Sequence, residues 1–174
     1  MRLSVCLLPL TLCAAPALAQ GAPPPNPLVD YAGFAALVTE LAPVREAHRL
    51  RWGEFIRRAR SEGALLLDAR SAAAFARGHI AGAINLPFSD FTDEALRAVI
   101  GPDANRPIYI YCNNNFSDNR DPVVTKRVAL ALNIPTFINL HGYGYRNVWE
   151  LADVIASRDP ATGWVGSGAL VPAT

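Results

Sequence analysis

Short, uninterrupted apolar runs alternate with helical stretches along this chain, and the alternation limits the possible folds more than any other feature. The clearest runs are 64–67 and 108–111, where no polar residue interrupts the apolar ones. Strands buried on both faces are typical of a parallel sheet covered by helices. The pattern therefore predicts an α/β fold with a mostly parallel central sheet. Further strands are predicted at 49–52, 83–86 and 136–140, and helices at 54–61, 72–77, 93–100, 123–132 and 147–155.

An extra helix is predicted ahead of this alternation, at 30–48. Phe34, Leu37, Val38 and Leu41 follow helical spacing until Pro43 interrupts it. We expect this helix to pack on the domain.

The start of the chain has the composition of a signal peptide. Arg2 precedes an apolar run at 3–12, and Ala17-Leu18-Ala19 is a typical cleavage site. The apolar run is too short for a membrane anchor, so we expect a periplasmic or secreted protein. The predicted segments are a signal peptide at 1–19, a proline-rich linker at 20–29, a domain at 30–157 with its core at 49–157, and a tail at 158–174 that Trp164 pins to the surface.

Export would leave a single cysteine, Cys112, because Cys6 and Cys13 lie in the leader. An intramolecular disulfide and a multi-cysteine zinc site are then excluded. Loss of Arg2 reduces the 16 basic residues to 15, equal to the 15 acidic ones, so nothing in the charge favours nucleic acid. The glycine-rich fingerprints of nucleotide sites are absent, and we expect neither a cofactor nor a metal.

Cys112 follows the predicted strand 108–111 and precedes the predicted helix 123–132. Backbone N–H groups and a helix N-terminus at such a place favour the thiolate, so we expect a solvent-accessible nucleophile. The other interpretation is an inert core thiol. The loop after Leu67 should meet the loop after Tyr111, because ligands gather at the carboxyl ends of parallel strands.

The residues after Leu67 carry a specific pattern, and Cys112 stands at a matching distance from them. Together they resemble the rhodanese homology domain over about residues 49–157. The later residues Gly142, Gly144 and Trp149 are similar to that family's glycine- and tryptophan-containing segment. The first part of the pattern is Asp68-x-Arg70, Phe75-x-x-Gly78-His79-Ile80, and Gly82-Ala83-x-Asn85-Leu86-Pro87.

The resemblance implies a single rhodanese-like domain that transfers sulfane sulfur. Cys112 would carry the sulfur as a persulfide, taken from a small donor such as thiosulfate and passed to a thiol or to cyanide. Backbone N–H groups of 113–119 would cradle the persulfide. Asp68, Arg70 and His79 are interpreted as structural. The predicted substrate-binding residues are Asn113, Asn114, Asn115, Phe116, Ser117, Arg120 and Arg146, with His141 beside Arg146.

The loop after Cys112 departs from the family pattern. The family closes this loop on an arginine five positions after the cysteine, whereas here Ser117 and Asp118 occupy the near positions and Arg120 is the first arginine. A cysteine phosphatase is disfavoured, since it needs an arginine at fixed reach. The alternative to a sulfurtransferase is a catalytically inactive binding module that uses the Asn-rich loop 113–119. The asparagines either contact substrate or only shape a turn, and the oligomeric state is left open.

Overall fold

The computed structural model describes residues 24–166. The predicted signal peptide, its cleavage site, residues 20–23 and residues 167–174 lie outside the described residues. The linker residues 24–29 form no helix or strand, and the Leu28 N–H donates to the Asn26 side chain in a turn. From Tyr31 onward the chain forms one compact unit. No helix of the described part is long and apolar enough to cross a bilayer.

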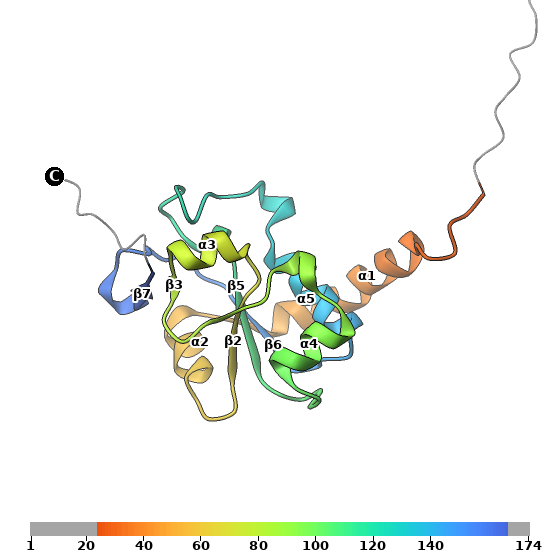
Figure 1. The fold of residues 1–174 in the computed structure, drawn as a ribbon, viewed down its shortest axis with the longest axis horizontal. Helices are drawn as coiled ribbons and strands as arrows, with labels where there is room; N and C mark the ends of the chain where they lie inside the picture. The colour runs from red at the N-terminus through yellow and green to blue at the C-terminus, as the bar shows by residue number, and fades with distance from the viewer. Residues whose placement is uncertain (1–23, 167–174) are drawn as a thin grey trace, which may run out of the picture. The chain divides into compact units, whose positions relative to one another are not determined.

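A central sheet of five parallel strands forms the core of this unit (Figure 1), as the sequence predicts. In spatial order the strands are β1 (Arg49–Leu50), β6 (Val148–Leu151), β5 (Ile108–Tyr111), β2 (Leu65–Asp68) and β4 (Ile84–Asn85). Strands β2 and β5 lie side by side in the sheet, with Asp68 paired in register with Tyr111. Their carboxyl ends therefore meet at one edge.

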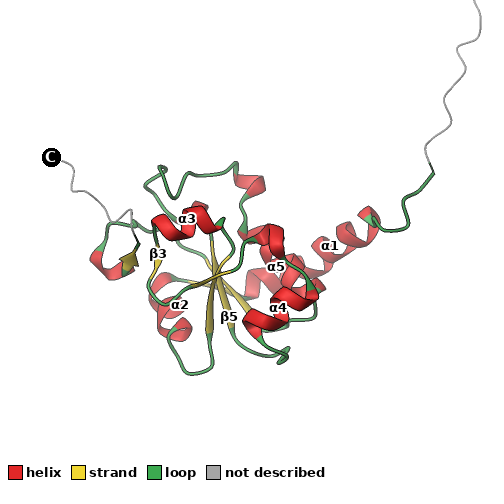
Figure 2. Cartoon of the chain, viewed as in Figure 1, coloured by secondary structure: helices red, strands yellow, loops and turns green. Residues whose placement is uncertain are grey.

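Helices cover both faces of the sheet (Figure 2). Successive side chains of a strand point to opposite faces, so Leu65 and Leu67 join one apolar cluster and Leu66 joins the other. The helices are α1 (Tyr31–Ala47), α2 (Trp52–Ala59), α3 (Ala72–Arg77), α4 (Asp93–Ile100) and α5 (Asn133–Gly142). The first cluster includes side chains of α1, α4 and α5, and the second includes those of α2.

Several elements agree closely with the sequence predictions. Strand β5 and helices α3 and α4 have the predicted limits, and the Thr92 side chain caps α4 by accepting the Ala95 N–H. Helix α1 is present, but it continues through Pro43 to Ala47 instead of breaking there.

The segment after Cys112 differs from the prediction in three places. Residues 123–132 form an irregular loop with one short 3-10 turn, Val128–Leu130, in place of a helix. The predicted strand 136–140 lies inside α5, and the predicted helix 147–155 holds β6. The segment 136–140 suits either a strand or a helix, and in the structure it follows the helical period. Phe137, Leu140 and His141 lie on the buried side of α5.

The C-terminal segment returns to the domain as a short strand. Strand β7 (Trp164–Val165) pairs antiparallel with β3 (His79–Ile80), so Trp164 fastens this segment to the domain. The indole ring lies directly over Gly78, where an added Cβ would be 2.3 Å from the Trp164 Nε1 atom. Glycine is therefore required at position 78 by close approach of a ring.

Replacing Gly78 with alanine is expected to lower the free energy of unfolding by about 1–3 kcal/mol, because the Trp164 ring has to move out of its site. Urea denaturation measures the change. Gly53→Ala is the matched control: it lies in α2 with no atom near its added Cβ, so alanine is expected to leave stability equal or higher. Equal stability of Gly78→Ala and the wild type would contradict this account.

Candidate active site

Cys112 stands at the carboxyl end of β5, at the start of a loop that occupies 113–132 before α5 begins. The residue is only 1 % exposed. The prediction of a solvent-accessible sulfur is therefore wrong for the described arrangement. The reason is the long connection: Asn114 on one side and Leu132 and Asn133 on the other bring their backbone over the sulfur.

One backbone N–H group donates to the Cys112 sulfur: that of Asn114, over 3.4 Å. The backbone amides of Asn133, the first residue of α5, and of Leu132, which precedes it, lie close enough to lower the pKa of the thiol. Burial raises the pKa of the Cys112 thiol, the three amides oppose the rise, and the Glu150 carboxylate adds to it. The net direction is upward, which favours the neutral thiol over the thiolate. A helix N-terminus does face the sulfur, but it belongs to α5 and not to the predicted helix at 123–132.

The predicted cradle of backbone amides from 113–119 does not form. The Asn115 N–H donates to the Cys112 carbonyl, the Phe116 N–H to Asn113, and the Ser117 N–H to Ile155. Of these amides, only that of Asn114 reaches the sulfur. The 3-10 turn (Asn113–Asn115) uses the first two of these donors, and a bridge to Ile155 uses the third.

The three asparagine side chains fix the course of the loop. Asn113 donates to the Val124 carbonyl, and Asn114 pairs with the backbone of Lys126 in both directions. Asn115 is buried, and its Oδ1 accepts the Cys112 N–H over 2.9 Å. These contacts favour the interpretation that the asparagines shape the loop.

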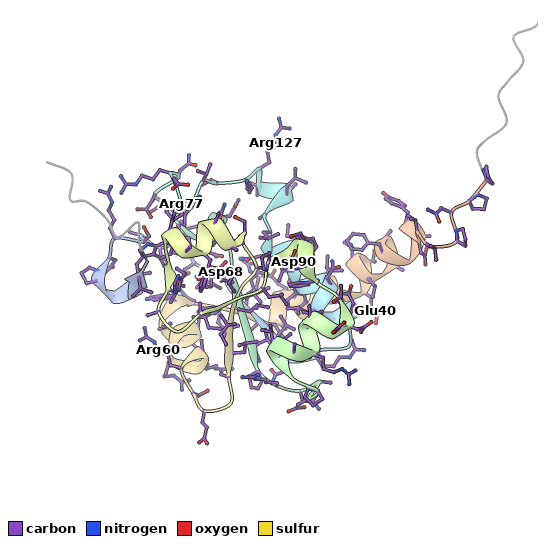
Figure 3. All side chains as sticks on the ribbon, in the orientation of Figure 1. Glu40, Arg60, Asp68, Arg77, Asp90 and Arg127 are labelled. Carbon is purple, nitrogen blue, oxygen red and sulfur yellow. The ribbon has the colours of Figure 1, made fainter. Side chains whose placement is uncertain are left out.

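The remaining predicted loop residues face away from the sulfur or anchor the chain. Phe116 is buried against the rings of Tyr111 and Trp164, whereas Ser117 and Arg120 are exposed. The two aspartates of the loop have partners elsewhere: Asp118 accepts the Ser157 N–H, and Asp121 pairs with Arg77. Figure 3 shows Arg127 pointing outward from the same loop. The loop thus brings no arginine to Cys112.

Arg146 does not belong to this site, which corrects the prediction. Helix α5 starts beside Cys112 and runs back along the sheet, so His141 in its last turn and Arg146 after it lie at the opposite end of the strands. The Arg146 side chain donates to the His141 carbonyl, and its N–H donates to Ala104. The error follows from assigning 136–140 to a strand.

Asp68 and Arg70 form a buried ion pair beneath the site. The guanidinium donates to both carboxylate oxygens, at 2.6 Å for Nη2–Oδ2, and Nη2 also donates to the Gly78 carbonyl. Tyr111 donates its hydroxyl to Asp68 over 2.7 Å, and burial raises the Tyr111 pKa well above its ordinary value. Figure 3 shows Asp68 inside the domain. These contacts hold the loop after β2 in place.

His79 is held by its own neighbours. Its Nδ1 atom lies 2.9 Å from the Phe75 carbonyl, and its ring stacks on the Phe75 ring. The histidine therefore fixes the turn that follows α3.

Two cavities adjoin the loop that covers Cys112. One, of about 260 Å³, lies between the first residues of α3 and the loop, with Asn113 and Leu132 in its wall. The other, of about 560 Å³, lies under the opposite side of the loop and includes Arg45, Arg49, Asn133 and Glu150. The remaining residues of the smaller cavity are Arg70, Ser71, Ala74, Lys126 and Leu130.

Three residues near the sulfur were missed in the sequence. Glu150 lies buried in β6, and Asn133 and Arg45 contact it. A glutamate inside the apolar run Val148–Leu151 is the available signal, but only once that run is recognised as a strand. Within residues 24–166 no group of three histidine, cysteine or acidic side chains is arranged to hold a metal ion.

Residues 52–153 match the family described as Rhodanese-like domain. Among solved structures, the chain is similar to the rhodanese-like domain of the Alr3790 protein from Anabaena, with 20% identity over 73% of this chain and 86% of that one, and a TM-score of 0.47. It is also similar to the BH2092 protein of Bacillus halodurans, with 18% identity over 69% and 75% of the two chains and a TM-score of 0.44. No curated protein matches the chain.

Proposed function

Because the chain belongs to the rhodanese-like domain family, we propose that it is an exported sulfurtransferase that carries sulfane sulfur as a persulfide on Cys112. The observation that carries the proposal is the Asn114 N–H that donates to the Cys112 sulfur, together with the Leu132 and Asn133 amides that oppose the rise of its pKa. A neutral thiol is a weak acceptor, whereas an anionic persulfide accepts such donors strongly. The proposal gives the sulfur a small donor such as thiosulfate, a thiol or cyanide as acceptor, and no cofactor.

The reaction runs in two displacements. The Cys112 thiolate attacks the outer sulfur of thiosulfate, the S–S bond of the donor breaks, and sulfite leaves with the electron pair. The persulfide left on Cys112 is then attacked at its terminal sulfur by the acceptor. Its S–S bond breaks, the electron pair returns to Sγ, and the acceptor leaves as a persulfide or as thiocyanate.

The loop over Cys112 has to open for either step, since the sulfur is buried. The smaller cavity is the favoured entry, because its wall holds Asn113, the residue after the cysteine, and Leu132, whose amide acts on the thiol. Lys126 is exposed and lines the same cavity, which places a positive charge beside the path of an anionic donor. The part of the wall that must move is the loop itself.

The burial of Cys112 also favours the second candidate, a binding module that kept the fold and lost the chemistry. The side chains of Asn113 and Asn114 are bonded to the loop backbone and that of Asn115 to the Leu151 carbonyl of β6, so such a module would bind through the exposed outer residues of the loop. Val128 and Leu130 are 85 % and 69 % exposed there.

A mass measurement distinguishes the two candidates. After incubation with thiosulfate and removal of excess donor, the sulfurtransferase is expected to gain about 32 Da, the mass of one sulfur atom, on the Cys112 peptide. The gain should disappear on adding cyanide, with release of thiocyanate, and should not occur in Cys112→Ser.

The same experiment contradicts the proposal if neither thiosulfate nor a persulfide donor adds mass to the folded protein. Unfolding the protein in urea before adding the donor supplies the control for access. Mass gained only after unfolding would mean that the closed site excludes donors, as expected of the binding module. N-terminal sequencing of the protein after expression in a Gram-negative bacterium tests the proposed cleavage after Ala19.

A further inference from the structure

Helix α1 precedes the segment that matches the family, and it nevertheless reaches the sulfur site. Arg45 in its last turn forms a bidentate ion pair with Glu150 of β6, with Nε–Oε2 and Nη2–Oε1 distances of 2.6 Å each. The Glu150 side chain is 5 % exposed. A buried carboxylate is stable only with a partner of opposite charge and good geometry, and Arg45 is that partner.

A chain of hydrogen bonds continues from Glu150 to Cys112. The Asn133 Nδ2 atom donates to Glu150 Oε1 over 3.3 Å and to Asn115 Oδ1 over 2.9 Å. Asn115 Oδ1 also accepts the Cys112 N–H over 2.9 Å. Reversing the Asn133 amide would set oxygen against oxygen at both acceptors, so its orientation is determined. Asn133 is also the first residue of α5, whose backbone N–H faces the sulfur.

We propose that Arg45 is a positioning residue for Cys112: by neutralising Glu150 it keeps negative charge away from the sulfur and holds Asn133 and Asn115 in place beside it. The N-terminal helix is then part of the sulfur site. The inference rests on Cys112 being the working sulfur of the proposed function. It does not depend on which donor or acceptor is used.

The charged groups around Cys112 explain why this pair matters. Glu150 is the acidic group that acts on the thiol from β6, and Arg45 answers it from α1. On the β2 side, Asp68 and Arg70 form their own closed pair, and Lys126 on the covering loop is exposed. Loss of Arg45 alone would leave the Glu150 carboxylate without its ion-pair partner, with only the Asn133 amide still donating to it.

Alkylation of the Cys112 peptide by iodoacetamide, followed by mass spectrometry across a pH series, tests the inference without any sulfur transfer. In Arg45→Gln the pH midpoint of alkylation is expected to rise by about one unit, because an unpaired carboxylate disfavours the thiolate. In Glu150→Gln, which keeps an oxygen for Asn133, the midpoint is expected to fall. The double variant should return toward the wild-type midpoint, and Arg45→Lys should recover part of the shift.

A merely structural role of Arg45 would not shift the pH midpoints of Arg45→Gln and Glu150→Gln in opposite directions. Arg57→Gln is the matched control, since Arg57 pairs with Glu54 on the surface of α2, and it should leave the midpoint unchanged. Unchanged midpoints in both Arg45→Gln and Glu150→Gln, or shifts in the same direction, would overturn the inference. If Arg45→Gln does not fold, the pH midpoint of Glu150→Gln is compared with the midpoints of the wild type and the double variant. Failed loading by thiosulfate with the expected midpoint shifts would count against the proposed function alone.

Discussion

Loading of Cys112 by thiosulfate is expected to become about tenfold faster for each unit of pH between 6 and 8, a total of about one hundredfold. The attacking species is the thiolate, and the pKa of the buried thiol is raised above its ordinary value. Even a thiol of ordinary pKa holds only about 3% thiolate at pH 7. Raising the pH therefore increases the thiolate in proportion to hydroxide across this range.

Single-turnover loading followed by intact mass measures the effect, because it separates loading from the titration of an acceptor such as cyanide. Cys112→Ser supplies the blank at each pH. A rate that is already constant between pH 6 and 7 would contradict the expectation. It would mean either that the amides of Asn114, Leu132 and Asn133 outweigh burial and hold the sulfur as an anion near neutral pH, or that opening of the covering loop limits the rate of loading.

Replacing Asp68 with alanine is expected to lower the free energy of unfolding by about 3–5 kcal/mol. The change leaves the buried Arg70 guanidinium without its carboxylate and removes the acceptor of the Tyr111 hydroxyl. Breaking one side of a buried ion pair costs this much because the remaining charge stays out of water. Equilibrium denaturation in urea measures the loss.

Asp121→Ala is the matched control for this prediction. Asp121 pairs with Arg77 at the surface, where such pairs contribute about 0–1 kcal/mol. A loss of less than 1 kcal/mol in Asp68→Ala, similar to that of the control, would show that Arg70 finds solvent or another acceptor. The buried pair would then be of little importance for the loop after β2.

The parts of the fold that could be predicted are those in which local pattern and tertiary environment agree. Strand 108–111 is apolar on both faces and lies in the middle of the sheet, so its composition reflects its surroundings directly. Helix 93–100 carries its own cap in Thr92. The parallel sheet follows from such elements even where the limits of others are wrong.

The segment between Cys112 and Val148 could not be predicted from its local pattern. Residues 134–140 are mostly apolar, and an apolar run of this length suits a buried strand and a buried helix equally. Pro135 was no guide, because proline is accepted in the first turn of a helix. Because residues 136–140 are predicted as a strand, His141 and Arg146 are expected beside Cys112, whereas they lie at the opposite end of the sheet.

The candidate site was predicted in position but not in environment. Cys112 at the end of β5 follows from the sequence, whereas its burial depends on a loop whose path is determined by distant backbone partners such as Val124 and Lys126. The contribution of Arg45 was not foreseen, because it requires α1 to pack beside β6. Such contacts arise only in the assembled fold.

Because its own loop encloses the Cys112 sulfur, a donor can bind only to those molecules in which the loop is open, however reactive the thiol is. The apparent affinity for a donor is reduced by the fraction of molecules that are open, so an open fraction of about 1% makes binding about a hundredfold weaker. A molecule that holds the exposed Val128 and Leu130 in an outward position would restore that factor without approaching the sulfur. For the sulfur transfer proposed above, activation from a distance, rather than a better nucleophile, is then the simplest route to a faster reaction.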